Sequence, residues 1–242
     1  LGLRTREWDW GFGYFDKIRA CNLLIEKAQD ATGITDEYRK QAIAEGKMMR
    51  AMIYFYQARH CGRFIWVDRV LTENDEFNLP LTKDMKESYT YVMQDINDAI
   101  AGLPETAEAG RFTKNAARVL KSEVCLTAAA YLGANGLGEL NLYEEAVKAV
   151  DGIQGVSLDA NYGGIFNEEG AYSSPEIILG HYYSKDNTVC SDVQMIRMQP
   201  NVMNSALTKT GYGPQWKVDG IFEGWIFFSP SQNLVDNYLV ID

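Results

Sequence analysis

The sequence predicts a mainly α-helical protein, built as a superhelix of tetratricopeptide-like helix pairs with an added loop-rich, aromatic-rich part that contains little strand. Over residues 1–153, apolar side chains recur at three- and four-residue spacing in successive segments, which is the period of helices with one buried face. Over residues 154–242, Gly, Asn, Ser and Tyr become frequent, and one run, EIILGHYY, is strand-like. We therefore expect a single domain over residues 1–242, with a helical repeat scaffold followed by a loop-rich, ligand-binding part.

The first two predicted helices are separated by a short loop. The first lies within residues 12–28, where apolar residues recur at helical spacing. The second begins at Thr35 or Asp36, because both side chains are suited to capping a helix. It runs to about Cys61, since Gly62 follows and favours the end of a helix.

Three further helices complete the predicted scaffold. The clearest apolar stripe lies in KESYTYVMQDINDAIAGLP, which stops at Gly102 and Pro104. Thr113 is placed to cap a helix that reaches Tyr131, and NLYEEAVKAVDGI predicts another that ends near Gly152. The pairs are spaced too unevenly to prove a strict tetratricopeptide repeat, whose period is about 34 residues.

Composition excludes several classes of protein. With 46% hydrophobic residues the chain can bury a substantial core, and its net charge of -10 opposes binding to nucleic acid. No apolar run reaches the roughly 18 residues that cross a bilayer. The four cysteines stand far apart with only two histidines to assist them. We therefore predict no metal and no cofactor, and we interpret the thiols in the helical runs as small buried hydrophobes.

No group of residues predicts catalysis. The sequence has no Gly-rich phosphate loop and no G-x-S-x-G turn. Carboxylates are plentiful, but the pair used in glycoside hydrolysis is defined by a distance in space. We therefore predict that the protein is not an enzyme.

The two ends of the sequence suggest a piece of a longer chain. Leu1 is not a methionine and the chain stops at LVID without a cap, so we expect a chain truncated at both ends.

The segment EGKMMRAMIYFY, residues 45–56, places one arginine within an apolar helix. On a helical wheel Arg50 shares a narrow polar stripe with Gly46, Tyr54 and Gln57. A guanidinium in a covered helix must be paired with a carboxylate or with helix-end carbonyls, because an unpaired buried charge is very costly. We interpret Arg50 as a structural clamp between helices, and an active-site role is the alternative.

At this segment the sequence resembles the SusD/RagB family, the SusD-like outer-membrane nutrient-binding lipoproteins of Bacteroidetes. Four further stretches match family motifs in the same order, over Trp10 to Tyr238. The matching residues and stretches are Glu45, Gly46, Arg50, Ala51, Tyr54 and Phe55 of the signature helix, WDWGFGYFDKIRACNLLIEKA, DINDAIAGLP, GRFTKNAARVLKSEVCL and SPSQNLVDNY. One departure is CGRFIWVD, which has Trp66 where the family commonly has a proline-containing turn.

The resemblance implies a helical, non-catalytic protein that binds an oligosaccharide or another nutrient at the cell surface. In that role it takes part in polysaccharide utilisation and delivers its ligand to a SusC-like TonB-dependent transporter of the outer membrane, to which it is held by a lipid anchor. Arg50, Tyr54 and Asn22 match motif positions and are expected to be structural. The alternatives are a helical-repeat module that binds proteins and, less favoured, a glycan-cleaving enzyme.

Aromatic side chains suggest where a sugar would bind. Sugars present flat C–H faces, so a glycan site uses exposed rings with polar groups around them. The stretch GYGPQWKVDGIFEGWIFFSP holds six aromatic residues among turn-forming glycines. Our candidate ligand-binding residues are Tyr212, Trp216, Trp225 and Trp8, and the alternative for these rings is packing in a core. Trp66 is a weaker candidate.

Overall fold

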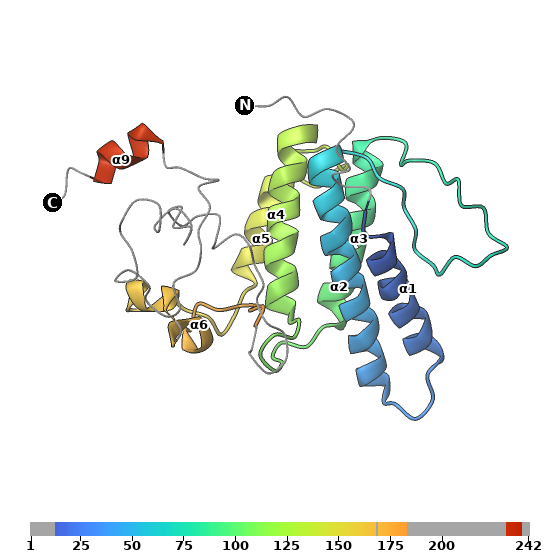
Figure 1. Ribbon diagram of the computed structural model, residues 1–242, viewed down its shortest axis with the longest axis horizontal. Helices are drawn as coiled ribbons and strands as arrows, with labels where there is room; N and C mark the ends of the chain where they lie inside the picture. Colours follow the sequence, from blue (N-terminus) through green and yellow to red (C-terminus); the bar gives the residue numbers. More distant parts are fainter. Residues whose placement is uncertain (1–12, 168, 183–230, 239–242) are drawn as a thin grey trace, which may run out of the picture. The chain divides into compact units, whose positions relative to one another are not determined.

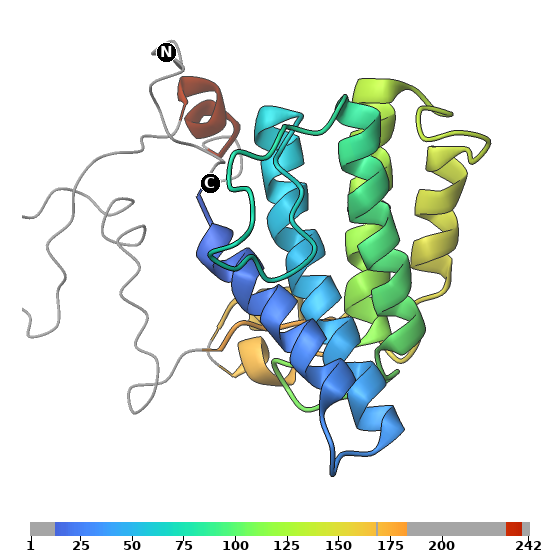
Figure 2. The ribbon, with the colours of Figure 1, turned by 90° about the vertical axis from the view of Figure 1, so that its right-hand side faces the viewer.

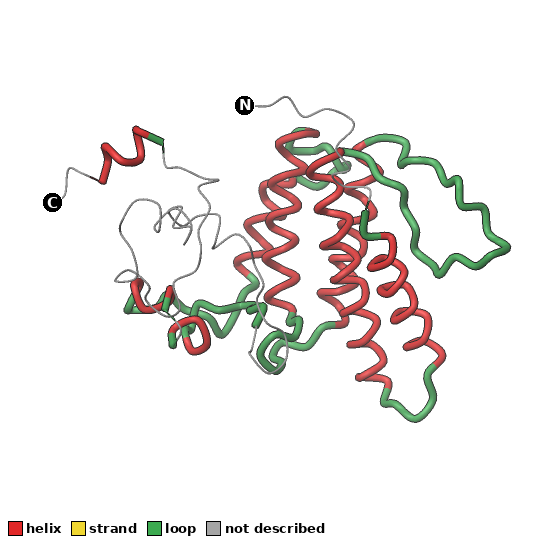
Figure 3. The backbone as a smooth tube through the Cα atoms, viewed as in Figure 1, coloured by secondary structure: helices red, strands yellow, loops and turns green. Residues whose placement is uncertain are grey.

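The computed structural model describes residues 13–167, 169–182 and 231–238, and the chain divides into two compact units, Leu1–His181 and Tyr182–Asp242. The described parts contain helices and no strand, which confirms the mainly helical prediction (Figures 1 and 3). The first unit holds α1 (Phe15–Asp30), α2 (Asp36–Cys61), α3 (Met85–Gly102), α4 (Lys114–Leu132), α5 (Leu142–Asp151), the 3-10 helix η1 (Tyr162–Phe166) and α6 (Gly170–Ser173). The second unit holds α9 (Gln232–Tyr238).

Helices α1 to α5 stand side by side in chain order and run alternately up and down (Figures 1 and 2). Each helix packs against the next one along the chain. This is the arrangement of stacked antiparallel pairs that the spacing predicted. The longest connection among these five helices, residues 62–84 between α2 and α3, extends away from them as a loop (Figure 1).

Polar side chains fix where most of these helices begin. Thr35, not Asp36, caps α2, because its Oγ1 accepts a hydrogen bond from the Tyr38 amide at 3.1 Å. Asp84 and Thr113 cap α3 and α4 in the same way. Asn141 caps α5, so all four later helices of the scaffold start at a local signal that the sequence carries.

Helix α1 starts later than the sequence suggested. Tyr14 precedes its first residue with φ 77, a left-handed conformation that a helix cannot include. The Gly13 carbonyl accepts a hydrogen bond from Gln57 Nε2 at 3.1 Å, and the Tyr14 ring meets the Tyr56 ring edge-on at 5.9 Å. These contacts with α2 hold the turn, so the regular helix begins at Phe15.

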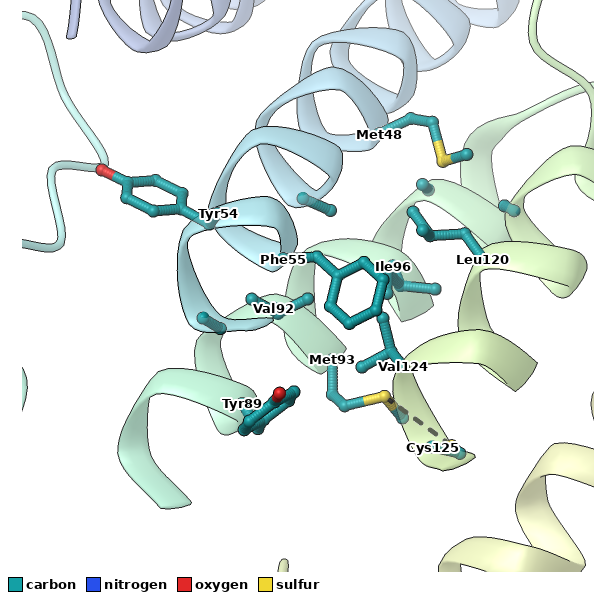
Figure 4. Close-up of a cluster of buried hydrophobic side chains, with 14 of the residues drawn as sticks. Met48, Tyr54, Phe55, Tyr89, Val92, Met93, Ile96, Leu120, Val124 and Cys125 are labelled. Carbon is teal, nitrogen blue, oxygen red and sulfur yellow. Dashed lines mark hydrogen bonds between the residues drawn. The ribbon is translucent and has the colours of Figure 1, made fainter. Parts of the chain in front are cut away.

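The core lies between α2, α3 and α4 (Figure 4). Large side chains from α2 and α3 meet the small residues of α4, and Ala117 and Ala128 are both fully buried. Small side chains on one helix allow a neighbouring helix to approach closely. Labelled members of this core in Figure 4 are Met48, Tyr54, Phe55, Tyr89, Val92, Met93, Ile96, Leu120, Val124 and Cys125.

Two local expectations were wrong. Cys61 is exposed at the end of α2, although Cys21 and Cys125 are buried as expected. Residues 176–182 of the strand-like run EIILGHYY form no strand, because a strand needs a partner and none of the described residues provides one.

Candidate functional site

Arg50 lies in the interior of the helical unit with a carboxylate beside it. Its Nε donates to Asp95 Oδ2 at 2.7 Å and its Nη2 donates to Asp95 Oδ1 at 2.8 Å. The side chains of Arg50 and Asp95 are 5% and 4% exposed. This two-pronged contact joins α2 to α3 and is the strongest geometry that a guanidinium and a carboxylate can adopt.

The same guanidinium also holds the start of the α2–α3 loop. Arg50 Nη1 donates to Asn22 Oδ1 at 2.7 Å and to the Asp68 carbonyl at 3.1 Å. Asn22 Nδ2 then donates to the carbonyls of Val67 and Arg69, at 3.0 and 2.9 Å. Asn22 therefore ties α1 to the start of this loop through two backbone carbonyls.

Tyr54 completes this clamp. Its hydroxyl accepts a hydrogen bond from the Val67 amide at 2.8 Å and lies 3.3 Å from the carbonyl of the same residue. The Val70 amide donates to Glu26 Oε1 at 2.8 Å. Arg50, Asn22 and Tyr54 are thus placed in one buried cluster, where they fasten three helices to one loop.

The pKa shifts of Arg50 and Asp95 reflect their burial and their contact with each other. Burial raises the pKa of the Asp95 carboxyl, while the hydrogen bonds and charge of Arg50 act to lower it. Burial opposes the charge on Arg50 as well, but the hydrogen bonds and charge of Asp95 outweigh it and raise the pKa of the guanidinium. We assign a charged pair, because both oxygens of Asp95 are engaged at ion-pair distances.

Trp66 packs against this cluster. Its ring stacks flat on Tyr91, with centroids 4.7 Å apart and planes at 3°, and the Arg50 guanidinium carbon lies 5.0 Å from its centroid. Tyr54 contacts it at 4.6 Å between centroids. Trp66 is therefore only partly exposed, and its main contacts are those of a packed ring.

The predicted ligand-binding aromatics lie outside the described residues. This holds for Tyr212, Trp216, Trp225 and Trp8, and for Trp10 of the first family motif. Their role stays a prediction. The helix α9 contains most of the SPSQNLVDNY motif and is described by itself.

A cavity of about 430 Å³ lies between α1 and the α2–α3 loop. The rings of Phe15 and Phe77 contribute to its walls and are 36% and 65% exposed. Two arginines also line it: Arg69 pairs with Asp75 at 2.7 Å, and Arg19 forms no ion pair with a described residue. Exposed rings beside charged groups can contact the faces and hydroxyls of a small polar ligand.

Sequence reasoning missed this cavity because the loop that forms half of it has no periodic pattern. The available signal was Phe77, a large apolar residue in the polar stretch TENDEFNLP.

In the described part of the chain, no group of three His, Cys, Asp or Glu side chains is arranged to hold a metal ion. No helix in that part has the length and hydropathy to cross a membrane.

Two known proteins similar to this chain are named as SusD-like or SusD. No family model matches the chain. The chain is 27% identical to a SusD-like protein of Bacteroides ovatus, over 75% of this chain and 35% of that protein. It is 30% identical to the starch-binding protein SusD of Bacteroides thetaiotaomicron, over 67% of this chain and 28% of that protein. The chain therefore spans about a third of the length of these relatives.

Solved structures point the same way. A SusD-like protein from Bacteroides fragilis is 28% identical and superimposes with a TM-score of 0.63, covering 79% of this chain and 35% of that one. A SusD superfamily protein from Parabacteroides distasonis reaches a TM-score of 0.69 at 24% identity, covering 81% and 41%. At that identity the second likeness shows the fold alone.

Proposed function

Because the chain belongs to the SusD-like family, we propose that it is a glycan-binding protein of the bacterial cell surface. The observation that carries the proposal is the 30% identity to the starch-binding protein SusD over 67% of this chain. The proposal includes delivery of the bound oligosaccharide to a SusC-like TonB-dependent transporter in the outer membrane. A lipid anchor would hold the protein there.

The helical unit supports this function as a rigid frame. The buried clamp of Arg50, Asp95 and Asn22 connects three helices to the α2–α3 loop. A loop fastened at its base presents its outer residues in a fixed position, which reduces the entropy lost when a ligand binds. Phe77 belongs to this loop and is 65% exposed at the cavity beside α1.

Binding itself would use aromatic rings that stack on the sugar. We assign this role to Tyr212, Trp216, Trp225 and Trp8, which lie among turn-forming residues or near the start of the chain. A ring of this size buries a large apolar area on a flat C–H face. Side-chain amides and carboxylates at its rim would then fix the orientation of the sugar hydroxyls.

The proposed protein binds its glycan without cleaving it. Support for this comes from the helical unit, where Asp95 is committed to Arg50. Asp95 is also only 4% exposed, so a sugar has no access to its carboxylate for acid–base chemistry. Incubation with polysaccharides should release no reducing ends, and a time-dependent increase in reducing ends would identify a hydrolase instead.

Affinity electrophoresis tests the binding. The chain is run on native gels that contain starch or another polysaccharide, and its migration is compared with that on a glycan-free gel. We expect at least one glycan to retard it. Trp216→Ala should migrate faster than the parent on that glycan. Tyr38→Ala removes a ring that is 54% exposed on α2 and should leave the retardation unchanged.

A further inference from the structure

A second cavity, of about 380 Å³, lies within the helical unit, where α3 faces the connection between α4 and α5. One wall is the α3 surface that carries Gln94 and Asn97. The other wall is formed by Leu137, Leu140 and Leu142 at the start of α5 and in the connection before it. Helix α4 stands between α3 and α5 (Figure 1), so both walls are mounted on packed helices.

The α3 wall offers hydrogen bonds that the protein does not use. Gln94 and Asn97 are exposed, and neither side chain makes a hydrogen bond with any residue that the structure describes. Each amide has both a donor and an acceptor. Residues three apart on a helix lie on one face with about 5–6 Å between their Cβ atoms. The wall therefore presents two complete amide groups side by side.

The opposite wall is apolar. Leu140 is 54% exposed although it lines the cavity, while Leu142 and Met93 are buried beneath it. An exposed leucine beside a concave surface loses water contact when an aliphatic group covers it, which favours binding. The cavity thus combines polar and apolar recognition on facing sides.

The charges at this cavity are already neutralised. Asp98 is paired with Lys47, and Glu145 is paired with Lys121 at 3.2 Å and with Lys148 at 3.0 Å. No arginine, lysine or aromatic residue is among the described residues that line it. An anionic ligand would find no free cation here, and a sugar would find no ring on which to stack.

We propose that this cavity binds an extended, uncharged segment of another polypeptide that carries aliphatic side chains. A peptide backbone has the donor and acceptor that Gln94 and Asn97 complement. Alternate residues of an extended chain repeat at about 6.5 Å, close to the separation of the two amides. A Leu or Ile side chain on the other edge of the segment then covers Leu140. This inference does not depend on the proposed glycan-binding function.

The test uses the 242-residue chain and a blocked peptide, acetyl-Ser-Leu-Asn-Leu-Ser-amide, followed by ¹⁵N nuclear magnetic resonance. Side-chain NH₂ signals of Gln94 and Asn97, assigned from Gln94→Ala and Asn97→Ala, should shift saturably with the peptide. Asn97→Ala should weaken binding by about 3- to 10-fold, the worth of one neutral hydrogen bond, and Leu140→Ala should weaken it as well. All three positions are exposed or half-exposed surface sites, so the variants keep the fold.

Gln29→Ala is the matched control, because Gln29 is an exposed helical glutamine outside the cavity, and it should bind like the parent. A peptide with serine in place of both leucines should bind more weakly. The proposal is overturned if no saturable shift occurs at peptide concentrations of about 1 mM, or if binding is unchanged in Asn97→Ala. It is also overturned if maltohexaose, and not the peptide, moves the two amide signals.

Discussion

Removing one partner of the buried Arg50–Asp95 pair should destabilise the protein far more than removing both. Arg50→Met leaves the Asp95 carboxylate buried without a cation, and Asp95→Leu leaves the guanidinium without an anion. Each change should lower the free energy of unfolding by about 3–5 kcal/mol. In the double variant no buried charge remains. Only the two other acceptors of Arg50, Asn22 Oδ1 and the Asp68 carbonyl, lose a donor, at a cost of about 1–3 kcal/mol.

Urea unfolding followed by far-ultraviolet circular dichroism measures these differences. The parent, both single variants and the double variant form a double-mutant cycle, whose coupling free energy isolates the pair. Arg111→Met is the control. Arg111 forms a two-pronged contact with Glu45, at 2.7 and 2.8 Å, but its side chain is 47% exposed. It should therefore lose less than about 1 kcal/mol.

The result that would refute this reasoning is a set of single variants that unfold within about 1 kcal/mol of the parent, as surface pairs do. A double variant that loses as much free energy of unfolding as either single variant would also contradict it. Amide hydrogen exchange adds a local readout. The Val70 amide is held by Glu26 at the clamped end of the loop, and it should exchange faster in Arg50→Met than in Arg111→Met.

Three further changes test other features of the helical unit. Tyr89→Phe should raise the free energy of unfolding by about 1–2 kcal/mol in urea titrations, because the buried Tyr89 hydroxyl has no partner among the described residues. Tyr54→Phe should lower this free energy, because it removes the acceptor of a loop amide. Equal effects of the two changes would contradict the different roles given to the two hydroxyls. Gly46→Ala should lower the thermal unfolding midpoint despite the better helix propensity of alanine, since a Cβ there would lie 2.8 Å from Ile25 Cγ1; an increase would mean that α1 moves away at little cost. Hydrogen bonds from its lysine partners lower the pKa of Glu145 in the folded protein, so its contribution is present above the unfolded-state pKa of about 4.3 and lost as pH falls through the lower folded value. Glu145→Gln should therefore be less stable than the parent at pH 7, and the difference should shrink as pH falls below about 4.3. A stability difference that is constant with pH would refute this.

The helices could be predicted from the sequence because their signals are local. Thr113 and the stripe that follows it place α4 within one residue of its observed end. The burial of Arg50 followed from its apolar neighbours, and a carboxylate partner was expected. That partner, Asp95, lies 45 residues away on another helix, and a single sequence does not give the distance between two helices. Its position in DINDAIAGLP was noted only as part of a family motif.

The cavities could not be predicted for the same physical reason. Each forms where a loop without periodicity meets a helix, as Phe77 does beside α1 and Leu140 does beside α3. Trp216 and the other proposed ligand-binding rings stay predictions from composition and turn chemistry.

Calorimetric titration of a soluble oligosaccharide into the 242-residue chain is the most direct test of the central claim, that this SusD-like chain binds glycans through stacking rings. The oligosaccharide is taken from the polysaccharide that retards the chain most, beginning with maltoheptaose for starch. We predict saturable binding with a negative heat-capacity change, which marks burial of apolar surface, and a weaker affinity for Trp216→Ala than for Tyr38→Ala. Absence of binding to every oligosaccharide tested, from a chain whose helical content and cooperative unfolding are intact, would contradict the claim.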